Sequence, residues 1–595
     1  MVGLLTYTSR VNGALQAVRC HIEVWMARRK IGVICAAFFL AALAIRCIGI
    51  NYGYLHGDER VNEAAKVLTG QLKPGQYFYP PLFNYCNAVY LAALYAIGRI
   101  IPIWYDAESF RNAYFEMPEL FYVTARFSTA VFAAAVSPLL YLIARSFGSS
   151  FFSALVCGLL AIFLPIGVYL SHIAKSDVPL ATMVVLIIYL IILRYQLKKN
   201  YVLDVVIGVA LAAAFSFKHS FIFIAAPLVA VNAYFCLTHL RGTLDLRSLV
   251  VITGSLVTAL AVFNLALIAD WREFIVYQQI QARMSARDVA GAFNGAMTWF
   301  GLVASTSSGI TIAALLAYFA LPFLLARSAA SNEIKLPILG VWVAISFATI
   351  AIIFITGGRQ QEGLWIPSFT GMFVLACIAI AFLLDDDDRN FQLIGAVTAV
   401  SILALSIFGV VRISKEAIAR PLTIDISRLI QKNYRNTKIW TSVHLGVPQM
   451  REAQQFEISR NEALGLKYGV FVPPRSVENI IRESAANAIY YINRPGTLHG
   501  LAGEDEKSLK GIVRAYAWPL QDAEWKLNYW RAMGIELFVI GHFDYELNHA
   551  ESPLIRNFSR EIVDNCTLVH VLGPRKPLFL ELDVSIFNCL PSPSN

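Results

Sequence analysis

The chain has 595 residues, of which 57% are hydrophobic and 15% charged, and its formal net charge is +9. A soluble protein with this balance would expose large apolar patches, so the composition excludes an ordinary soluble enzyme. Much of the positive charge stands at the ends of apolar runs, where lysine and arginine set membrane topology, so it does not indicate nucleic-acid binding. The composition predicts a polytopic helical membrane protein.

The first apolar run, residues 31–50, follows a basic and polar segment that has no small-residue cleavage site. We therefore expect this run to stay in the membrane as an anchor. Arg28, Arg29 and Lys30 place its start in the cytoplasm, so its other end reaches the outer face. Two adjacent acids, Asp58 and Glu59, come soon after that end.

Twelve apolar runs are candidate spans: 31–50, 80–98, 119–144, 150–171, 178–193, 202–217, 220–238, 248–269, 298–326, 336–356, 364–384 and 391–411. If run 80–98 crosses, the cations near Arg194 and Arg241 fall outside. If it lies along the outer surface, they fall inside together with Arg145 and Arg327, as the positive-inside rule requires. The charges predict eleven spans, with 80–98 as a juxtamembrane helix in a long external loop, 51–118.

This topology gathers several polar residues at the outer face: Asp58, Glu59, Tyr79, Arg126, Lys175, Asp177, Lys218 and Arg359. An acidic pair at a membrane surface can bind a divalent cation or take a proton from an attacking hydroxyl; the alternative is a solvated loop. A cation inside a span, such as Arg126, either snorkels to the interface or pairs with an acid or a phosphate. Short outer loops with cations favour an anionic substrate.

The composition changes near residue 415, which divides the chain into a membrane domain, 1–412, and a polar domain, 413–595. Short apolar runs such as 488–492 and 536–540 alternate there with helical stretches, which is typical of a small α/β domain. The charge topology places this domain outside the cytoplasm, where Cys566 and Cys589 could pair. The acidic run 385–388 falls on the cytoplasmic side and is predicted to be a solvated loop rather than a calcium site.

In its charged and proline-containing motifs the sequence resembles the GT-C superfamily of membrane glycosyltransferases. It is most similar to the bacterial relatives of dolichyl-phosphate-mannose protein mannosyltransferases and of lipid A aminoarabinose transferases. The matching features lie in order over residues 31–220: the pair Asp58-Glu59, Tyr79-Pro80-Pro81-Leu82, Arg126-Phe127-Ser128-Thr129-Ala130, Tyr141 to Gly148, Lys175-Ser176-Asp177-Val178-Pro179-Leu180 and Phe217-Lys218. Gly357-Gly358-Arg359-Gln360 resembles a later family element loosely, and the C-terminal domain matches no family element.

The resemblance implies transfer of a hexose or pentose from a polyprenyl-phosphate carrier to a glycan, lipid or protein acceptor, with inversion. It implies a multi-pass protein of a bacterial inner membrane, with the active site and the C-terminal domain on the periplasmic side. Asp58 is then the general base or a metal ligand, Glu59 supports it, and Asp177 is a second acid.

The resemblance makes Arg126, Lys175, Lys218, Arg359 and Tyr79 donor or phosphate contacts. A divalent metal, Mg²⁺ or Mn²⁺, held by Asp58 and Asp177 stays an open alternative. The chemistry itself needs a base for the acceptor hydroxyl and cations for the departing phosphate.

Two other functions compete with this interpretation. A transporter or flippase of a lipid-linked sugar would use the same outward cations, but it should show inverted-repeat halves or broken helices near the midplane. A membrane assembly protein whose working part is the C-terminal domain predicts that changes at Asp58 are silent.

Overall fold

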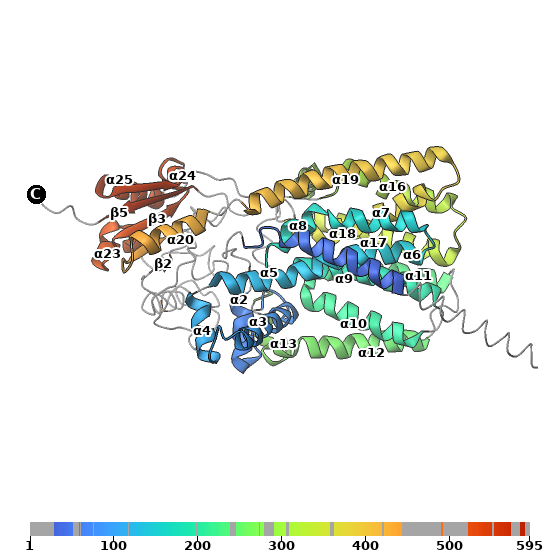
Figure 1. Ribbon diagram of the computed structural model, residues 1–595, viewed down its shortest axis with the longest axis horizontal. Coiled ribbons are helices and arrows are strands. Elements are labelled where there is room, and N and C mark those ends of the chain that lie inside the picture. The colour runs from blue at the N-terminus through green and yellow to red at the C-terminus, as the bar shows by residue number, and fades with distance from the viewer. Residues whose placement is uncertain are drawn as a thin grey trace, which may run out of the picture.

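The computed structural model describes residues 29–51, 59, 61–74, 77–116, 118–197, 200–238, 246–272, 274–275, 277–278, 291–304, 309–356, 362–418, 422–442, 459, 489–491, 522–549, 553–572 and 583–589. They form a bundle of long apolar helices with a small sheet domain beyond one end of it (Figure 1). The expected architecture, an all-α membrane domain followed by an α/β domain, is confirmed.

The elements of the bundle begin with the helix Arg29–Cys47. The others, in chain order, are α2 (Val61–Lys66), η1 (Val67–Gln71), α3 (Leu82–Ile100), α4 (Ala107–Glu116), α5 (Pro118–Ala134), α6 (Val136–Ser146), α7 (Phe151–Ile162), α8 (Pro165–Ser171), α9 (Asp177–Gln196), α10 (Tyr201–Phe217), η2 (His219–Phe221), α11 (Ile222–Thr238), α12 (Leu246–Phe263), α13 (Leu265–Ala269), α15 (Gly291–Ala304), α16 (Ile312–Arg327), α17 (Asn332–Thr356), α18 (Glu362–Leu384) and α19 (Arg389–Ile418).

Six helices among the described residues are long and apolar enough to cross a membrane, or seven if the bent pair α7 and α8 is one span. Four shorter apolar helices fall on the remaining expected spans: Tyr201–Phe217, His219–Val231, Arg247–Phe263 and Ile312–Arg327. Each of the eleven expected spans therefore coincides with an apolar helix or helix pair, although the four short ones do not reach the length of a full span.

Helix α3 has the length of a span but is not among the helices that could cross. It lies with α2, α4 and α13 at the end of the bundle nearer the C-terminal domain, crosswise to the long helices (Figure 1). Pro81 stands just before its first turn, where a missing amide donor costs nothing. This placement agrees with the juxtamembrane helix that the charge distribution predicts.

The span formed by α7 and α8 bends by 42° at its break. Pro165 begins α8, and the chain cannot continue the hydrogen bonding of α7 through it. The side chain of Arg46, which is buried, donates to the carbonyls of Ala161 and Ile162 in the last turn of α7, at 3.3 and 3.1 Å. A cation at the carbonyl end of a helix is favourable, so Arg46 stabilises the break.

The end of the bundle away from the C-terminal domain uses the acidic run 385–388 as structure. Asp385 accepts hydrogen bonds from the Ser150 amide and the Ser153 hydroxyl at 2.9 and 2.6 Å, and so caps the N-terminus of α7. Asp386 lies 3.4 Å from the guanidinium of Arg327. The run is therefore an inter-helix contact rather than the fully solvated loop that its composition predicts.

The C-terminal domain contains α20 (Leu422–Asn433), β1 (Ile439–Thr441), β2 (Ile489–Tyr491), η5 (Asp522–Trp525), α23 (Leu527–Ala532), β3 (Leu537–Gly541), α24 (Phe543–Asn548), α25 (Pro553–Asn565), β4 (Thr567–Leu572) and β5 (Val584–Asn588). The sheet order is β2-β1-β3-β5-β4. Strands β2, β1 and β3 are parallel to one another, and β5 is antiparallel to both of its neighbours, β3 and β4.

Strand β3 is buried on both faces. Leu537 and Val539 pack on the side of α20, whereas Phe538 and Ile540 pack with Trp530 of α23 on the other side. This alternation is the two-residue period of a strand covered by helices on both faces. The expected strands 488–492 and 536–540 are therefore confirmed as β2 and β3 where the structure describes them; the expected helix 476–488 lies outside the described residues.

Candidate active site

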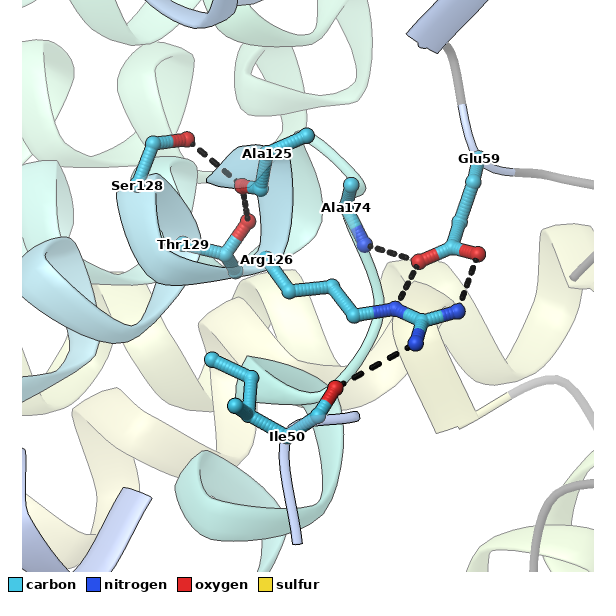
Figure 2. A network of polar contacts seen from close by, with 7 residues as sticks. All are labelled: Ile50, Glu59, Ala125, Arg126, Ser128, Thr129 and Ala174. Atoms are coloured by element: carbon cyan, nitrogen blue, oxygen red, sulfur yellow. Dashed lines mark hydrogen bonds and ion pairs between the residues drawn. The ribbon is translucent and has the colours of Figure 1, made fainter. Parts of the chain in front are cut away.

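A buried ion pair joins the segment after the first span to α5. The guanidinium of Arg126 donates from Nε and Nη2 to the two carboxylate oxygens of Glu59 at 2.6 and 2.7 Å (Figure 2). Arg126 is completely buried and Glu59 is 7% exposed. Of the two alternatives that the sequence leaves open for Arg126, the structure shows pairing with an acid and not snorkelling to the interface.

Glu59 also holds the loop between α8 and α9. Its Oε1 accepts a hydrogen bond from the backbone amide of Ala174 at 2.9 Å, while Arg126 donates from Nη1 to the carbonyl of Ile50 at 3.2 Å (Figure 2). One ion pair therefore fixes the end of the first span, the chain that follows Asp58, and the loop that carries Lys175.

A second charged cluster lies one residue further along that loop. Asp177 begins α9, is 1% exposed, and contacts two ammonium groups. Its Oδ1 accepts a hydrogen bond from Nζ of Lys218, and its Oδ2 lies 3.6 Å from Nζ of Lys175. Lys218 comes from the extended residue between α10 and η2, so three elements meet at this carboxylate.

Tyr79 lies against the same cluster. The centre of its ring is 5.5 Å from Nζ of Lys218, a cation–π contact. Tyr79 precedes the two prolines that open α3, so the loop before α3 reaches the second cluster directly. The sequence-predicted residues thus form two groups of contacts, Glu59 with Arg126, and Tyr79 with Lys175, Asp177 and Lys218. The chain joins the two groups, because Glu59 binds the amide of Ala174, the residue before Lys175.

The start of α18 closes one side of this cluster. A Cβ added at Gly363 would lie 2.8 Å from Oδ2 of Asp177 and 3.0 Å from its Cγ, closer than real Cβ contacts allow. Only glycine lets the first turn of α18 approach the carboxylate this closely. The sequence alone gave no sign of this contact, because Gly363 is one of 36 glycines and lies 186 positions after Asp177.

The surroundings of Asp177 do not fit a divalent cation. Two lysine ammonium groups lie within 4 Å of its carboxylate, and they would repel a dication. No cluster of three potential metal ligands occurs among the residues that the structure describes. The expected metal site between Asp58 and Asp177 stays a prediction from the sequence, and we derive no chemical step from it.

Two of the expected site residues, Asp58 and Arg359, lie outside the described residues, so their placement stays a prediction. Their chain neighbours are described: Glu59 is part of the buried network and Glu362 begins α18.

Comparison with known proteins gives a family match and a fold match. Residues 94–277 match the family of dolichyl-phosphate-mannose-protein mannosyltransferases, a range that includes Arg126, Lys175, Asp177 and Lys218. The chain is similar to the structure of ArnT from Cupriavidus metallidurans bound to undecaprenyl phosphate, with 13% sequence identity over 94% of this chain and 98% of that chain and a TM-score of 0.51. No curated protein sequence matches the chain.

Two further solved structures show weaker similarity. AglB, an archaeal oligosaccharyltransferase from Archaeoglobus fulgidus, has 11% identity over 90% of this chain and 73% of that chain, with a TM-score of 0.44. AftD, an arabinofuranosyltransferase from Mycobacteria, has 13% identity over 94% and 41%, with a TM-score of 0.43. The resemblance to GT-C glycosyltransferases that the sequence motifs predict is therefore confirmed, by the family match and by the fold.

Proposed function

We propose that this protein is a glycosyltransferase that moves a sugar from a polyprenyl-phosphate carrier to an acceptor hydroxyl at the outer face of a bacterial inner membrane. The observation that carries the proposal is the buried cluster of Lys175, Asp177 and Lys218, inside the range that matches the mannosyltransferase family. The relative with the same fold was solved with undecaprenyl phosphate, which is the class of carrier that we propose here.

The proposed reaction is a single displacement at the anomeric carbon. The acceptor oxygen forms a bond to that carbon while the bond from the carbon to the phosphate oxygen breaks, and the electron pair leaves with the phosphate. Asp58 takes the proton of the acceptor hydroxyl, and the ammonium groups of Lys175 and Lys218 stabilise the phosphate charge. One displacement inverts the configuration at the anomeric carbon.

The ion pairs suggest separate roles for Asp177 and Glu59 in this reaction. An ammonium has three N–H donors, and Lys218 gives one of them to Asp177. Asp177 thus holds the two lysines near one another before the carrier binds. The carrier phosphate would then replace Asp177 in part of its contacts with the lysine ammonium groups. Glu59 acts by fixing the chain that carries Asp58, because its own carboxylate is bonded to Arg126 and Ala174.

Two observations support the sidedness of the proposal. Cys566 and Cys589 form a disulfide, and disulfides persist in oxidising compartments such as the bacterial periplasm. The cations expected inside, Arg194 and Arg327, stand in the last turns of α9 and α16, and Arg327 contacts Asp386 of the acidic run that the charges place on the cytoplasmic side. Both favour a periplasmic C-terminal domain.

The decisive experiment is transfer activity of Asp58→Asn in proteoliposomes, with mass spectrometry of the product. Loss of a general base should lower kcat by about 10²–10⁴-fold while the protein still inserts and unfolds as the wild type does. Asp387→Asn is the control, because Asp387 is an exposed carboxylate of the acidic run at the other end of the bundle. Transfer at the wild-type rate by Asp58→Asn would refute the proposal.

The substrate and the alternative function can be tested in the same vesicles. A panel of polyprenyl-phosphate hexoses and pentoses, offered with glycan, lipid and peptide acceptors, should yield one transferred sugar with inverted anomeric configuration. A flippase would instead move a labelled lipid-linked sugar between leaflets without forming a product. That outcome, found with every donor in the panel, would replace the transferase by the transporter.

The sidedness has its own test. A cysteine placed at Gly446, in a protein whose Cys566–Cys589 disulfide is kept intact, should react with a membrane-impermeant thiol reagent from the periplasmic side. Labelling only after the inner membrane is opened would reverse the topology and place the charged cluster in the cytoplasm.

A further inference from the structure

The segment 270–278, which follows α13, fastens the external loop that carries Tyr79. Asp270 accepts a hydrogen bond from Nζ of Lys73 on one carboxylate oxygen and from the hydroxyl of Tyr77 at 2.5 Å on the other. The side-chain amide of Gln278 donates to the carbonyl of Tyr77 at 3.2 Å. The backbone of the loop is thus bound two residues before Tyr79.

Aromatic packing reinforces these bonds. Tyr77 is completely buried, and its ring meets that of Tyr277 edge to face at 6.3 Å between centres. The ring of Phe78 meets the same Tyr277 ring at 4.7 Å. Two consecutive loop residues are therefore packed on one side chain of the segment, which limits how far Tyr79 can move.

The same segment also packs against the residue next to Lys218, the cation that Tyr79 contacts. The ring of Phe274 lies 5.3 Å from that of His219, the residue next to Lys218. Segment 270–278 therefore contacts both sides of the Tyr79–Lys218 pair, one through Tyr77 and one through His219. The position of this segment therefore bears on the position of the aromatic ring relative to the ammonium group.

Building on the proposed function, we infer that Asp270 is a positioning residue for carrier binding. Its carboxylate binds Lys73 and Tyr77, and it acts on carrier binding through Tyr77. Through Tyr77 it sets where the ring of Tyr79 stands over Lys218, and so it sets the direction in which the Lys218 ammonium faces the carrier phosphate.

The electrostatics of Asp270 agree with this role. Partial burial raises its pKa, but the hydrogen bonds from Lys73 and Tyr77 and the charge of Lys66 lower it more, so the pKa lies below its ordinary value. The carboxylate therefore stays charged and keeps both donors at neutral pH.

The first test needs no ligand. Asp270→Ala should increase hydrogen exchange of the backbone amides in peptides covering 77–85 and 214–224, because both lose a common support. The matched control is Asp386→Ala. Asp386 and its partner Arg327 have side chains 18% and 44% exposed, close to the 15% and 47% of Asp270 and Lys73, but lie at the other end of the bundle. Unchanged exchange in both peptides would overturn the inference.

The second test measures binding of sugar-free undecaprenyl phosphate by native mass spectrometry. Asp270→Ala and Tyr77→Phe should each raise the Kd for undecaprenyl phosphate. The increase for Asp270→Ala should be about tenfold, the effect expected when a charge-assisted hydrogen bond that positions the site is lost. Asp270→Glu should restore part of the loss, because it keeps the charge.

A double-mutant cycle with Lys218 separates positioning from a general loss of structure. If Asp270 acts through Lys218, Asp270→Ala combined with Lys218→Met should bind no more weakly than Lys218→Met alone. Additive losses, or a large fall in the unfolding midpoint of Asp270→Ala, would overturn the inference. Wild-type protein that binds undecaprenyl phosphate but transfers no sugar would refute the proposed function and leave this inference standing.

Discussion

The substitution Glu59→Gln should destabilise the whole membrane domain, although it changes only one atom and one charge. The wild-type carboxylate receives two charge-assisted hydrogen bonds from Arg126, at 2.6 and 2.7 Å, and a third from the Ala174 amide at 2.9 Å. Glutamine keeps one acceptor oxygen and turns an NH₂ group towards a guanidinium nitrogen. The fully buried Arg126 would then hold an uncompensated charge.

Breaking a buried ion pair in this way costs about 3–5 kcal/mol. The exposed pair between Arg412 and Glu416 is the control: its atoms lie 3.2 Å apart, four residues apart on α19, and its arginine is 56% exposed. Glu416→Gln should cost no more than about 0.5 kcal/mol. The two substitutions are chemically identical, so the difference between them measures burial.

The free energy of unfolding can be measured by titration with SDS in mixed micelles, followed by circular dichroism. The double variant Glu59→Leu with Arg126→Met should regain most of the stability that Glu59→Gln loses, because no charge stays buried. A loss below about 1 kcal/mol for Glu59→Gln would mean that the pair behaves as a solvated surface pair, and the geometry described here would be refuted.

Three further predictions concern other sites. Gly363→Ala should displace the carboxylate of Asp177 and raise the KM for the carrier, with the wild-type value as the result that contradicts the close contact. Cys566→Ser should destabilise the C-terminal domain by about 3 kcal/mol, measured by thermal unfolding, and an unchanged midpoint would mean that the disulfide closes no loop of the unfolded chain. The stabilisation that Asp270 provides should be complete above the ordinary aspartate pKa and lost as the pH falls through its lowered value; in a pH series of unfolding midpoints, Asp270→Asn should lack this loss.

The order of the apolar helices in the membrane part could be predicted because hydropathy fixes it locally, and the charges add a prediction about the helix at 80–98. The cations at Arg145, Arg194 and Arg327 require one side, and only a non-crossing helix at 80–98 puts them there. The structure agrees, since α3 lies crosswise at the end of the bundle. Strands β2 and β3 of the C-terminal domain were also predictable from short apolar runs. The strand order was not, because pairing depends on contacts between distant residues.

The candidate site was predictable as a set of residues but not as a set of bonds. The sequence placed Glu59 and Arg126 on one face, yet nothing in it said that they form a pair buried from water. Asp270, Lys73 and Tyr77 were missed altogether. Their nearest signal is an acid at the outer end of an apolar run, which is also the usual place for a solvated residue.

The two charged contacts along α9 and α10 bear on how the protein enters the membrane. These helices are joined by a short connection and form ion pairs at both ends: Arg194 with Asp204 beside the connection, and Asp177 with Lys218 at the open end. The two helices can therefore enter the bilayer together as a hairpin whose charges already neutralise one another. Sliding one helix past the other by a single turn would break both pairs at once, so the two ion pairs fix the register between α9 and α10.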